Sequence, residues 1–80
     1  MMKFLTKKSK ELYDEIDSLV RDIEFEYNGV HCAICPFSRT NIAINYGKNS
    51  KDCTSIEQAM TTSIFKGRNL NEIAEELVYL

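Results

Sequence analysis

The 80-residue sequence has no tryptophan, one proline, three glycines and three cysteines, and each shortage limits what the chain can be. Three cysteines are too few, and odd in number, for the disulfide framework of a small secreted protein; they suit reduced thiols in a cytosol. Proline, glycine and serine never cluster, so the sequence predicts one domain over residues 1–80 without a linker. A chain this short buries only about 60 to 65% of its unfolded surface, which leaves little material for a deep pocket.

An excess of charge of one sign is also missing, as are long hydrophobic runs. Ten lysines and arginines against twelve acids give a formal net charge of -2, which provides no general attraction for nucleic acid or an acidic membrane. The basic N-terminus has no apolar core after it, and no segment approaches the ~20 apolar residues of a membrane span. We therefore expect a cytoplasmic protein. Frequent Lys, Asn, Ile and Tyr are compatible with an AT-rich gene of a bacterium or a mobile element.

The first segment with a clear pattern runs from Ser9 to about Arg21. Its apolar residues recur at helical spacing and its acids occupy the opposite side, which predicts an amphipathic helix with a solvated acidic face. The apolar positions are Leu12, Ile16, Leu19 and Val20, and the acids are Glu11, Asp14, Glu15 and Asp17.

Apolar residues then occupy every second position from Ile23 to Tyr46, interrupted by Asn28-Gly29 and by a loop from Pro36 to Thr40. This alternation predicts a three-stranded antiparallel β-meander with one buried face. A two-residue turn at Asn28-Gly29 and a five-residue loop pairing Cys35 with Asn41 would set the register. The core residues then meet in three rungs: Ile23, Ile34 and Ile42; Phe25, Cys32 and Ile44; Tyr27, Val30 and Tyr46.

A competing interpretation continues the first helix to Tyr27 and leaves only a two-stranded hairpin. The helical spacing reaches Ile23, and no glycine or proline interrupts the chain between Val20 and Phe25. Asn28 or Gly29 would then end the helix.

Two helices are predicted after a polar loop that follows Tyr46-Gly47. Thr54 with Glu57 forms a capping box for the first, and Gly67 ends it; Asn69 with Glu72 starts the second. Their inward residues are Ile56, Ala59, Met60, Ser63 and Ile64, then Leu70, Ile73, Ala74 and Leu77. The predicted fold is α+β, in the order α-β-β-β-α-α, with the N-terminal helix and the two C-terminal helices packed on one face of the sheet.

Cys32 and Cys35 form a Cys-x-x-Cys pair, the pattern of a metal chelate or a redox dithiol. On a strand, however, the two thiols lie about 10 Å apart on opposite faces, so we interpret them as structural, Cys32 buried and Cys35 outward. The only histidine, His31, would stand across from Glu26 and beside Asn45. No nucleophile accompanies this pair, and we predict a surface hydrogen bond.

Two partial resemblances bear on nucleic-acid binding. The α-β-β-β-α order resembles the double-stranded RNA-binding fold, but the stretch Thr54-Ser55-Ile56-Glu57-Gln58 has no cation where that family has its lysine-rich phosphate clamp. Residues 69–77 resemble the first helix of a helix-turn-helix, yet no recognition helix follows and three glutamates would repel phosphates. Neither resemblance carries its activity with it.

The outer face of the predicted sheet is the best candidate for function. Small side chains make it flat, which suits docking against a protein and provides no cleft for a substrate. Its predicted residues are Glu24, Glu26, His31, Ala33, Cys35, Asn41, Ala43 and Asn45, with Glu24, Ala33 and Ala43 in one row.

We expect a non-enzymatic interaction or regulatory module, without catalytic residues, cofactor or metal, that binds a protein partner or itself. A homodimer would form through the strand Asn41 to Tyr46, predicted to be an unprotected edge, or face to face across Ala33 and Ala43. The alternatives are a small thiol or metal protein using Cys32 and Cys35, or a nucleic-acid accessory protein. The latter would use the cations Arg39, Lys48, Lys51, Lys66 and Arg68.

Overall fold

The computed structural model describes residues 3–19 and 21–80, so the predicted inward position of Val20 lies outside the described residues. The elements in chain order are α1 (Lys7–Ser18), β1 (Ile23–Tyr27), β2 (Val30–Ser38), β3 (Asn41–Tyr46), β4 (Asn49–Cys53), α2 (Ile56–Thr61), α3 (Leu70–Ile73), the 3₁₀-helix η1 (Ala74–Glu76) and β5 (Val78–Tyr79).

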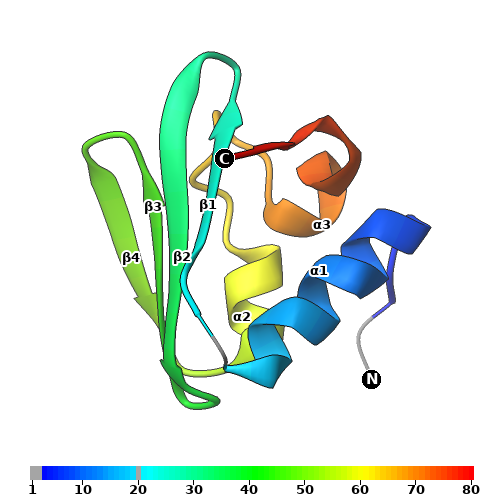
Figure 1. The fold of residues 1–80 in the computed structure, drawn as a ribbon, viewed down its shortest axis with the longest axis vertical. Coiled ribbons are helices and arrows are strands. Elements are labelled where there is room, and N and C mark those ends of the chain that lie inside the picture. Colours follow the sequence, from blue (N-terminus) through cyan, green and yellow to red (C-terminus); the bar gives the residue numbers. More distant parts are fainter. Residues whose placement is uncertain (1–2, 20) are drawn as a thin grey trace.

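Two layers make up the fold. The described residues form a five-stranded antiparallel sheet in the order β4-β3-β2-β1-β5. Helices α1, α2 and α3 all lie on one face of the sheet, and no helix formed by residues 3–19 and 21–80 covers the other face (Figure 1). The predicted α+β class with helices on one face is confirmed, but the sheet has five strands instead of three.

Helix α1 begins two residues earlier than predicted because Thr6 is its N-cap. The Thr6 hydroxyl accepts from the Ser9 amide, and the Ser9 hydroxyl in turn accepts from the Thr6 amide. The helix ends where Leu19 adopts a left-handed conformation at φ 54°, and its amide still donates to the Ile16 carbonyl. Continuation of the helix to Tyr27 is therefore wrong, although neither glycine nor proline marks the stop.

The first hairpin has the predicted register. Tyr27 pairs with Val30, Phe25 with Cys32 and Ile23 with Ile34. Both turn residues have positive φ, 57° for Asn28 and 77° for Gly29, as a two-residue turn of type I′ requires.

The second hairpin differs from the prediction because Pro36 and Ser38 belong to β2. Pro36 pairs with Ile42 and Ser38 with Asn41, so the turn is only Arg39-Thr40 and Phe37 forms a bulge between the two pairs. The register is shifted by two residues, and a shift of two leaves every side chain on its predicted face. The corrected rungs are Ile23, Ile34 and Ile44; Phe25, Cys32 and Tyr46; Pro36 and Ile42.

Two strands were missed by the sequence analysis. Strand β4 occupies the stretch predicted as a polar loop and pairs with residues 42–46 of β3, from Tyr46 with Asn49 to Ile42 with Cys53. Strand β5 pairs with β1 through Phe25 with Tyr79 and Glu26 with Val78. Strand β3 is therefore internal, and its predicted role as an open edge is wrong.

The C-terminal helices are shorter than predicted. The N-cap of α2 is Ser55, whose hydroxyl accepts from the Gln58 amide at 3.0 Å, so the predicted Thr54–Glu57 capping box is wrong. Gly67, at φ 79°, lies in a tight turn between Phe65 and Arg68 and does not end a helix. The predicted capping box of Asn69 and Glu72 is present at the start of α3.

The core fills the space between the sheet and the helices. The largest fully buried side chains come from both layers and include Phe25, Phe65, Leu12, Ile16, Ile34, Ile42, Ile44, Met60, Leu70 and Ile73. Of the inward helix positions predicted, Ser63 is exposed and Ile64 is half-buried because α2 ends at Thr61.

Candidate functional site on the open face of the sheet

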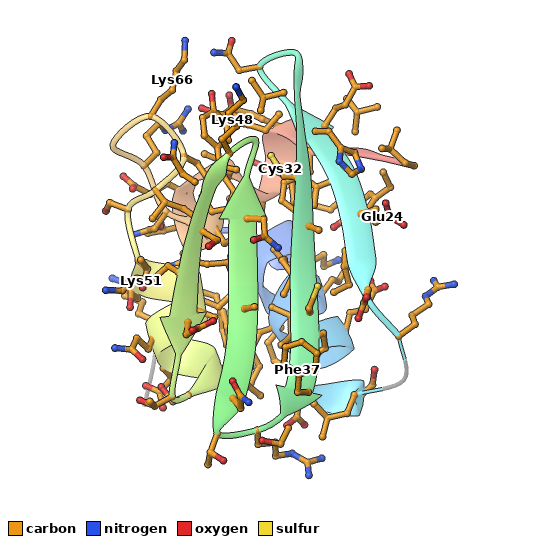
Figure 2. The ribbon with its side chains drawn as sticks, turned by 90° about the vertical axis from the view of Figure 1, so that its left-hand side faces the viewer. Glu24, Cys32, Phe37, Lys48, Lys51 and Lys66 are labelled. Carbon is orange, nitrogen blue, oxygen red and sulfur yellow. The ribbon has the colours of Figure 1, made fainter. Side chains whose placement is uncertain are left out.

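The face without helices carries the side chains that alternate with the core residues, and we call it the open face (Figure 2). Strand pairing arranges these side chains in rows that cross the sheet. The rows are Cys35, Ala43 and Asp52, with Asp22 beside Cys35; Glu24, Ala33, Asn45 and Ser50; and Val78, Glu26 and His31.

Seven of the eight predicted surface residues lie in these rows, and the eighth, Asn41, begins β3 opposite Ser38. The predicted row of Glu24, Ala33 and Ala43 is wrong because of the two-residue register shift. Ala33 lies opposite Asn45, and Ala43 lies opposite Cys35. The middle of the open face is thus built from Ala33, Cys35, Ala43 and Asn45, all of them half-buried.

The two thiols of the Cys-x-x-Cys pair point to opposite faces, as the strand register predicts. Cys32 is 1% exposed in the core, where burial raises its pKa. Cys35 is half-buried on the open face, and its pKa is raised by burial and further by the carboxylates of Asp22 and Glu24. A raised pKa keeps a thiol protonated and a poor nucleophile, so neither cysteine has the environment of a reactive thiol.

His31 pairs with Glu26 in the register, but its side chain reaches Glu24 instead. His31 Nε2 lies 3.1 Å from Glu24 Oε1, and both side chains are exposed. The expected position beside Asn45 is wrong. The contact is the predicted kind of surface hydrogen bond, and the open face contributes no hydroxyl or thiol to it.

Several residues of this surface were not anticipated from the sequence: Asp22, Phe37, Ser50, Asp52 and Val78. Phe37 is 70% exposed and points outward at the end of β2, where the bulge lies (Figure 2). Asp22 stands next to Cys35, and Asp52 lies opposite Ala43. The sequence contains a signal for Asp22, because this residue continues the alternation of Glu24 and Glu26. Asp52 could be placed on the open face only once β4 was recognised as a strand.

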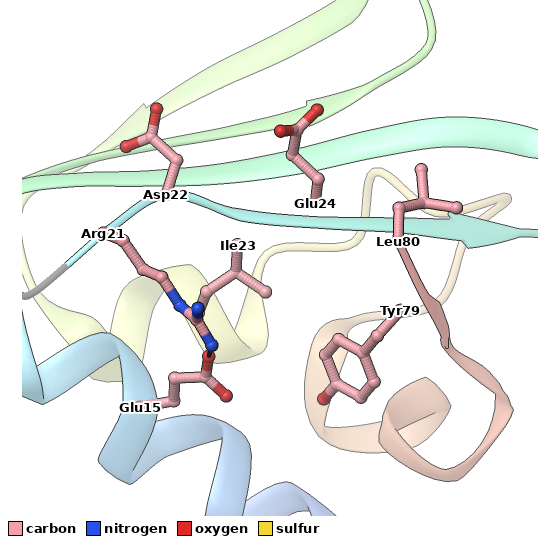
Figure 3. Close-up of a pocket in the computed structure, with 7 residues that line it drawn as sticks. All are labelled: Glu15, Arg21, Asp22, Ile23, Glu24, Tyr79 and Leu80. Atoms are coloured by element: carbon pink, nitrogen blue, oxygen red, sulfur yellow. Dashed lines mark ion pairs between the residues drawn. The ribbon is translucent and has the colours of Figure 1, made fainter.

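A shallow cleft of about 370 Å³ lies at the rim of the sheet, between α1 and the β1–β5 edge (Figure 3). Arg21 and Glu15 form an ion pair across it at 3.7 Å. Tyr79 stands on the same side, where burial, Glu15 and Glu11 raise its pKa and keep the phenol neutral. Asp22 and Glu24 also line the cleft, but their carboxylates point to the other side of β1 from Glu15 and Tyr79 (Figure 3).

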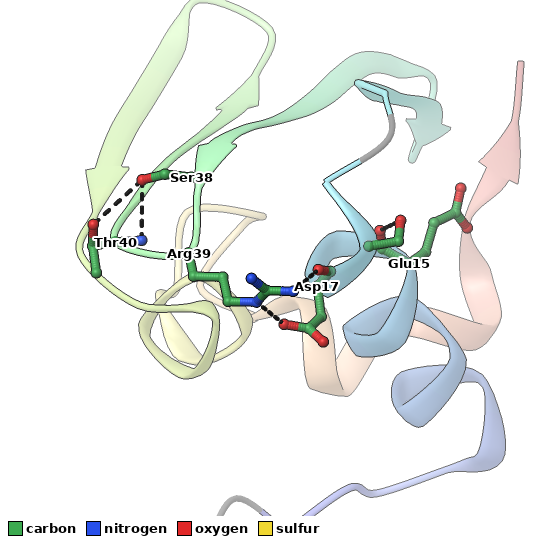
Figure 4. A network of polar contacts seen from close by, with 6 residues as sticks. Glu15, Asp17, Ser38, Arg39 and Thr40 are labelled. Atoms are coloured by element: carbon green, nitrogen blue, oxygen red, sulfur yellow. Dashed lines mark hydrogen bonds and ion pairs between the residues drawn. The ribbon is translucent and has the colours of Figure 1, made fainter.

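The candidate cations do not meet at one place. Arg39 is held at one end of the sheet by Asp17, with its Nε donating to Oδ1 at 2.7 Å (Figure 4). Arg68 is paired with Glu76 at 2.8 Å and also donates to the Tyr27 hydroxyl. The remaining candidates Lys48, Lys51 and Lys66 lie toward the β4 side and the upper end of the sheet, away from Glu24 (Figure 2).

Neither a metal centre nor a membrane-crossing helix is found in residues 3–19 and 21–80. These residues do not bring three or more His, Cys, Asp or Glu side chains together as metal ligands. Their helices are also too short and polar to span a bilayer. No protein-family model, curated protein sequence or solved structure matches the chain.

Proposed function

We propose that the protein is a small non-enzymatic interaction module whose open face docks against another protein. The observation that carries the proposal is the asymmetry of the sheet, with every helix on one face and a flat row of half-buried small side chains on the other. Sheets that pack against a partner layer do so at about 10 Å, and small side chains in the centre allow that approach.

Phe37 adds an apolar contact at the end of this surface. Its side chain is 70% exposed. It lies at the bulge, where the regular pairing of β2 with β3 is interrupted. Bulges reorient individual side chains, and exposed aromatic rings are enriched at the centre of protein interfaces. Phe37 therefore provides the anchor that the alanines alone would lack.

The proposal includes self-association only as a face-to-face homodimer. Pairing through the β3 edge is not available because β4 covers it, and the actual edge strand β4 carries Lys51 and Asp52, charges that discourage strand pairing. A homodimer would have to form face to face across Ala33 and Ala43.

Ala43→Arg tests the proposal because it places a long charged side chain in the middle of the open face. The matched control is Thr61→Arg, which puts the same side chain on the exposed surface of α2. We expect tagged wild type and the control to co-purify the same protein from cells that express the chain naturally, and Ala43→Arg to lose it.

Phe37→Ser is a second variant in case Ala43→Arg does not fold, and circular dichroism checks both. Retention of the partner by both folded variants would contradict the proposal. Light scattering on the purified proteins shows whether the partner is a second copy of the chain.

A nucleic-acid accessory role is the second candidate, and the position of Lys48, Lys51 and Lys66 along the β4 side and the upper end of the sheet, away from Glu24, favours it (Figure 2). It predicts binding to mixed RNA and DNA at low salt that weakens steeply as salt is added. The docking proposal predicts no such binding.

A further inference from the structure

Charge on the open face is unevenly distributed. Asp22, Glu24 and Glu26 form a column of carboxylates along β1, and Asp52 adds a fourth on β4. Every position in the three rows that cross the face is described, and none is a lysine or arginine. Although the whole chain carries a formal net charge of only -2, this face is acidic.

The β1 carboxylates have the spacing of a strand. They occupy every second position, so their attachment points are about 7 Å apart along β1. The nearest arginine in the chain, Arg21, points to the other side of β1 and pairs with Glu15 (Figure 3). On the open face, His31 contacts this column through Glu24 and carries a charge only when protonated, and the neutral thiol of Cys35 contacts it through Asp22.

We infer that the partner on the open face is a basic protein segment in extended conformation, with lysine or arginine at alternate positions facing the β1 carboxylates. This inference rests on the proposed function and names the chemistry of the partner. Phe37 and the row of small side chains would receive the partner's apolar residues beside the charged contacts.

A second copy of the chain fits this surface less well. In a face-to-face dimer the open faces meet, and the only β4 side chains on that face are Ser50 and Asp52. Lys51 alternates with them and is paired with the buried Ile44, on the helix side of the sheet. Carboxylates would thus face serine, asparagine or other carboxylates, without cations to compensate.

The test uses fluorescently labelled octapeptides and fluorescence anisotropy at pH 7.5 and low salt. The probe (Lys-Ala)₄ has the proposed spacing, Lys₄Ala₄ has the same composition without it, and (Glu-Ala)₄ reverses the charge. We expect (Lys-Ala)₄ to bind best, Lys₄Ala₄ more weakly and (Glu-Ala)₄ not at all, with affinity falling as salt increases.

Two double variants distinguish the effect of the open-face carboxylates on peptide binding from the effect of the net charge of the protein. Glu24→Gln with Glu26→Gln should weaken (Lys-Ala)₄ binding about tenfold. Glu57→Gln with Glu75→Gln changes the net charge equally at exposed positions on α2 and η1, and should leave binding within about twofold. Equal loss in both variants, equal binding of the two lysine peptides, or no binding would overturn the inference.

The partner captured from cells distinguishes this inference from the proposed function. A partner that depends on Ala43 but contacts the protein through an acidic or uncharged segment, or is a second copy of the chain, would refute the basic segment and leave the docking surface standing. A partner bound elsewhere would refute both.

Discussion

The two faces of the sheet are made from the same strands, yet their side chains have different surroundings. Inward positions carry Ile34, Ile44 and Phe25, which are fully buried against the helices. Outward positions of the same strands carry alanine, cysteine, asparagine and carboxylates, and the central ones are half-buried without any layer over them. One face therefore stabilises the fold, while the other is available for binding.

The two faces also differ in how much their side chains contribute to the stability of the fold. Burial of large apolar side chains explains why the inner face folds, at roughly 25 cal/mol per Å² of apolar surface removed from water. The outer face contributes little of that burial, so its flat shape, its acidic column and the exposed Phe37 ring are not requirements of the core. Substitutions on the two faces should consequently have opposite effects on stability and on binding.

The largest effect on stability is expected at the centre of the inner face. Ile44→Ala empties a fully buried site and should lower the free energy of unfolding by about 2 to 4 kcal/mol. Ala43→Ser, one position away on the open face, should change it by less than about 0.5 kcal/mol. Urea denaturation of both variants measures the contrast, and similar costs would mean that the two faces do not differ as described.

A smaller loss is expected in the helix layer at Asn71, which is buried and holds the N-terminal segment. Its amide nitrogen donates to the Lys3 carbonyl at 2.9 Å, and its side-chain oxygen accepts from the Leu5 amide at 3.1 Å. Asn71→Ala should cost about 1 to 3 kcal/mol, because the N-terminal segment loses both hydrogen bonds to this buried side chain. Asn45→Ala on the open face is the control, and thermal unfolding that ranks the two variants equally would contradict this role.

Thiol chemistry gives a third comparison of the faces. Alkylation of the native protein should modify Cys35 before Cys32, which is shielded in the core. Since the carboxylate of Asp22 contributes to the raised pKa of Cys35, Asp22→Asn should lower that pKa and speed its alkylation near pH 8. Mass spectrometry of a labelling time course follows both sites. Equally fast labelling of the two cysteines, or no acceleration in the variant, would go against this assignment.

Much of the fold could be predicted because alternation fixes the face of the strand residues between Ile23 and Tyr46, outside the predicted turn at Asn28-Gly29 and the predicted loop from Pro36 to Thr40. The second register could not be predicted, because Pro36 suggested a loop and a shift of two residues leaves the same side chains inside. Leu19 ended the first helix in a left-handed conformation that sequence patterns associate with glycine or asparagine.

The missed strands explain what was wrong about the candidate site. Strand β4 reads as a polar loop because it buries only Cys53, and β5 is two residues long. Without β4, Asp52 could not be assigned to the open face, and β3 was mistaken for an edge. The prediction that Ala33, Cys35, Ala43 and Asn45 face outward survived these errors, although their predicted rows did not, because it depended only on alternation along β2 and β3.

The most direct test of the open face as the docking surface is photo-crosslinking in cells that express the protein naturally. A photoreactive amino acid would replace Ala43 or Asn45 on the open face, and Glu57 or Thr61 on the exposed side of α2 as controls. The account predicts adducts with one protein from positions 43 and 45 and none from positions 57 and 61. Adducts from the α2 positions alone would contradict it.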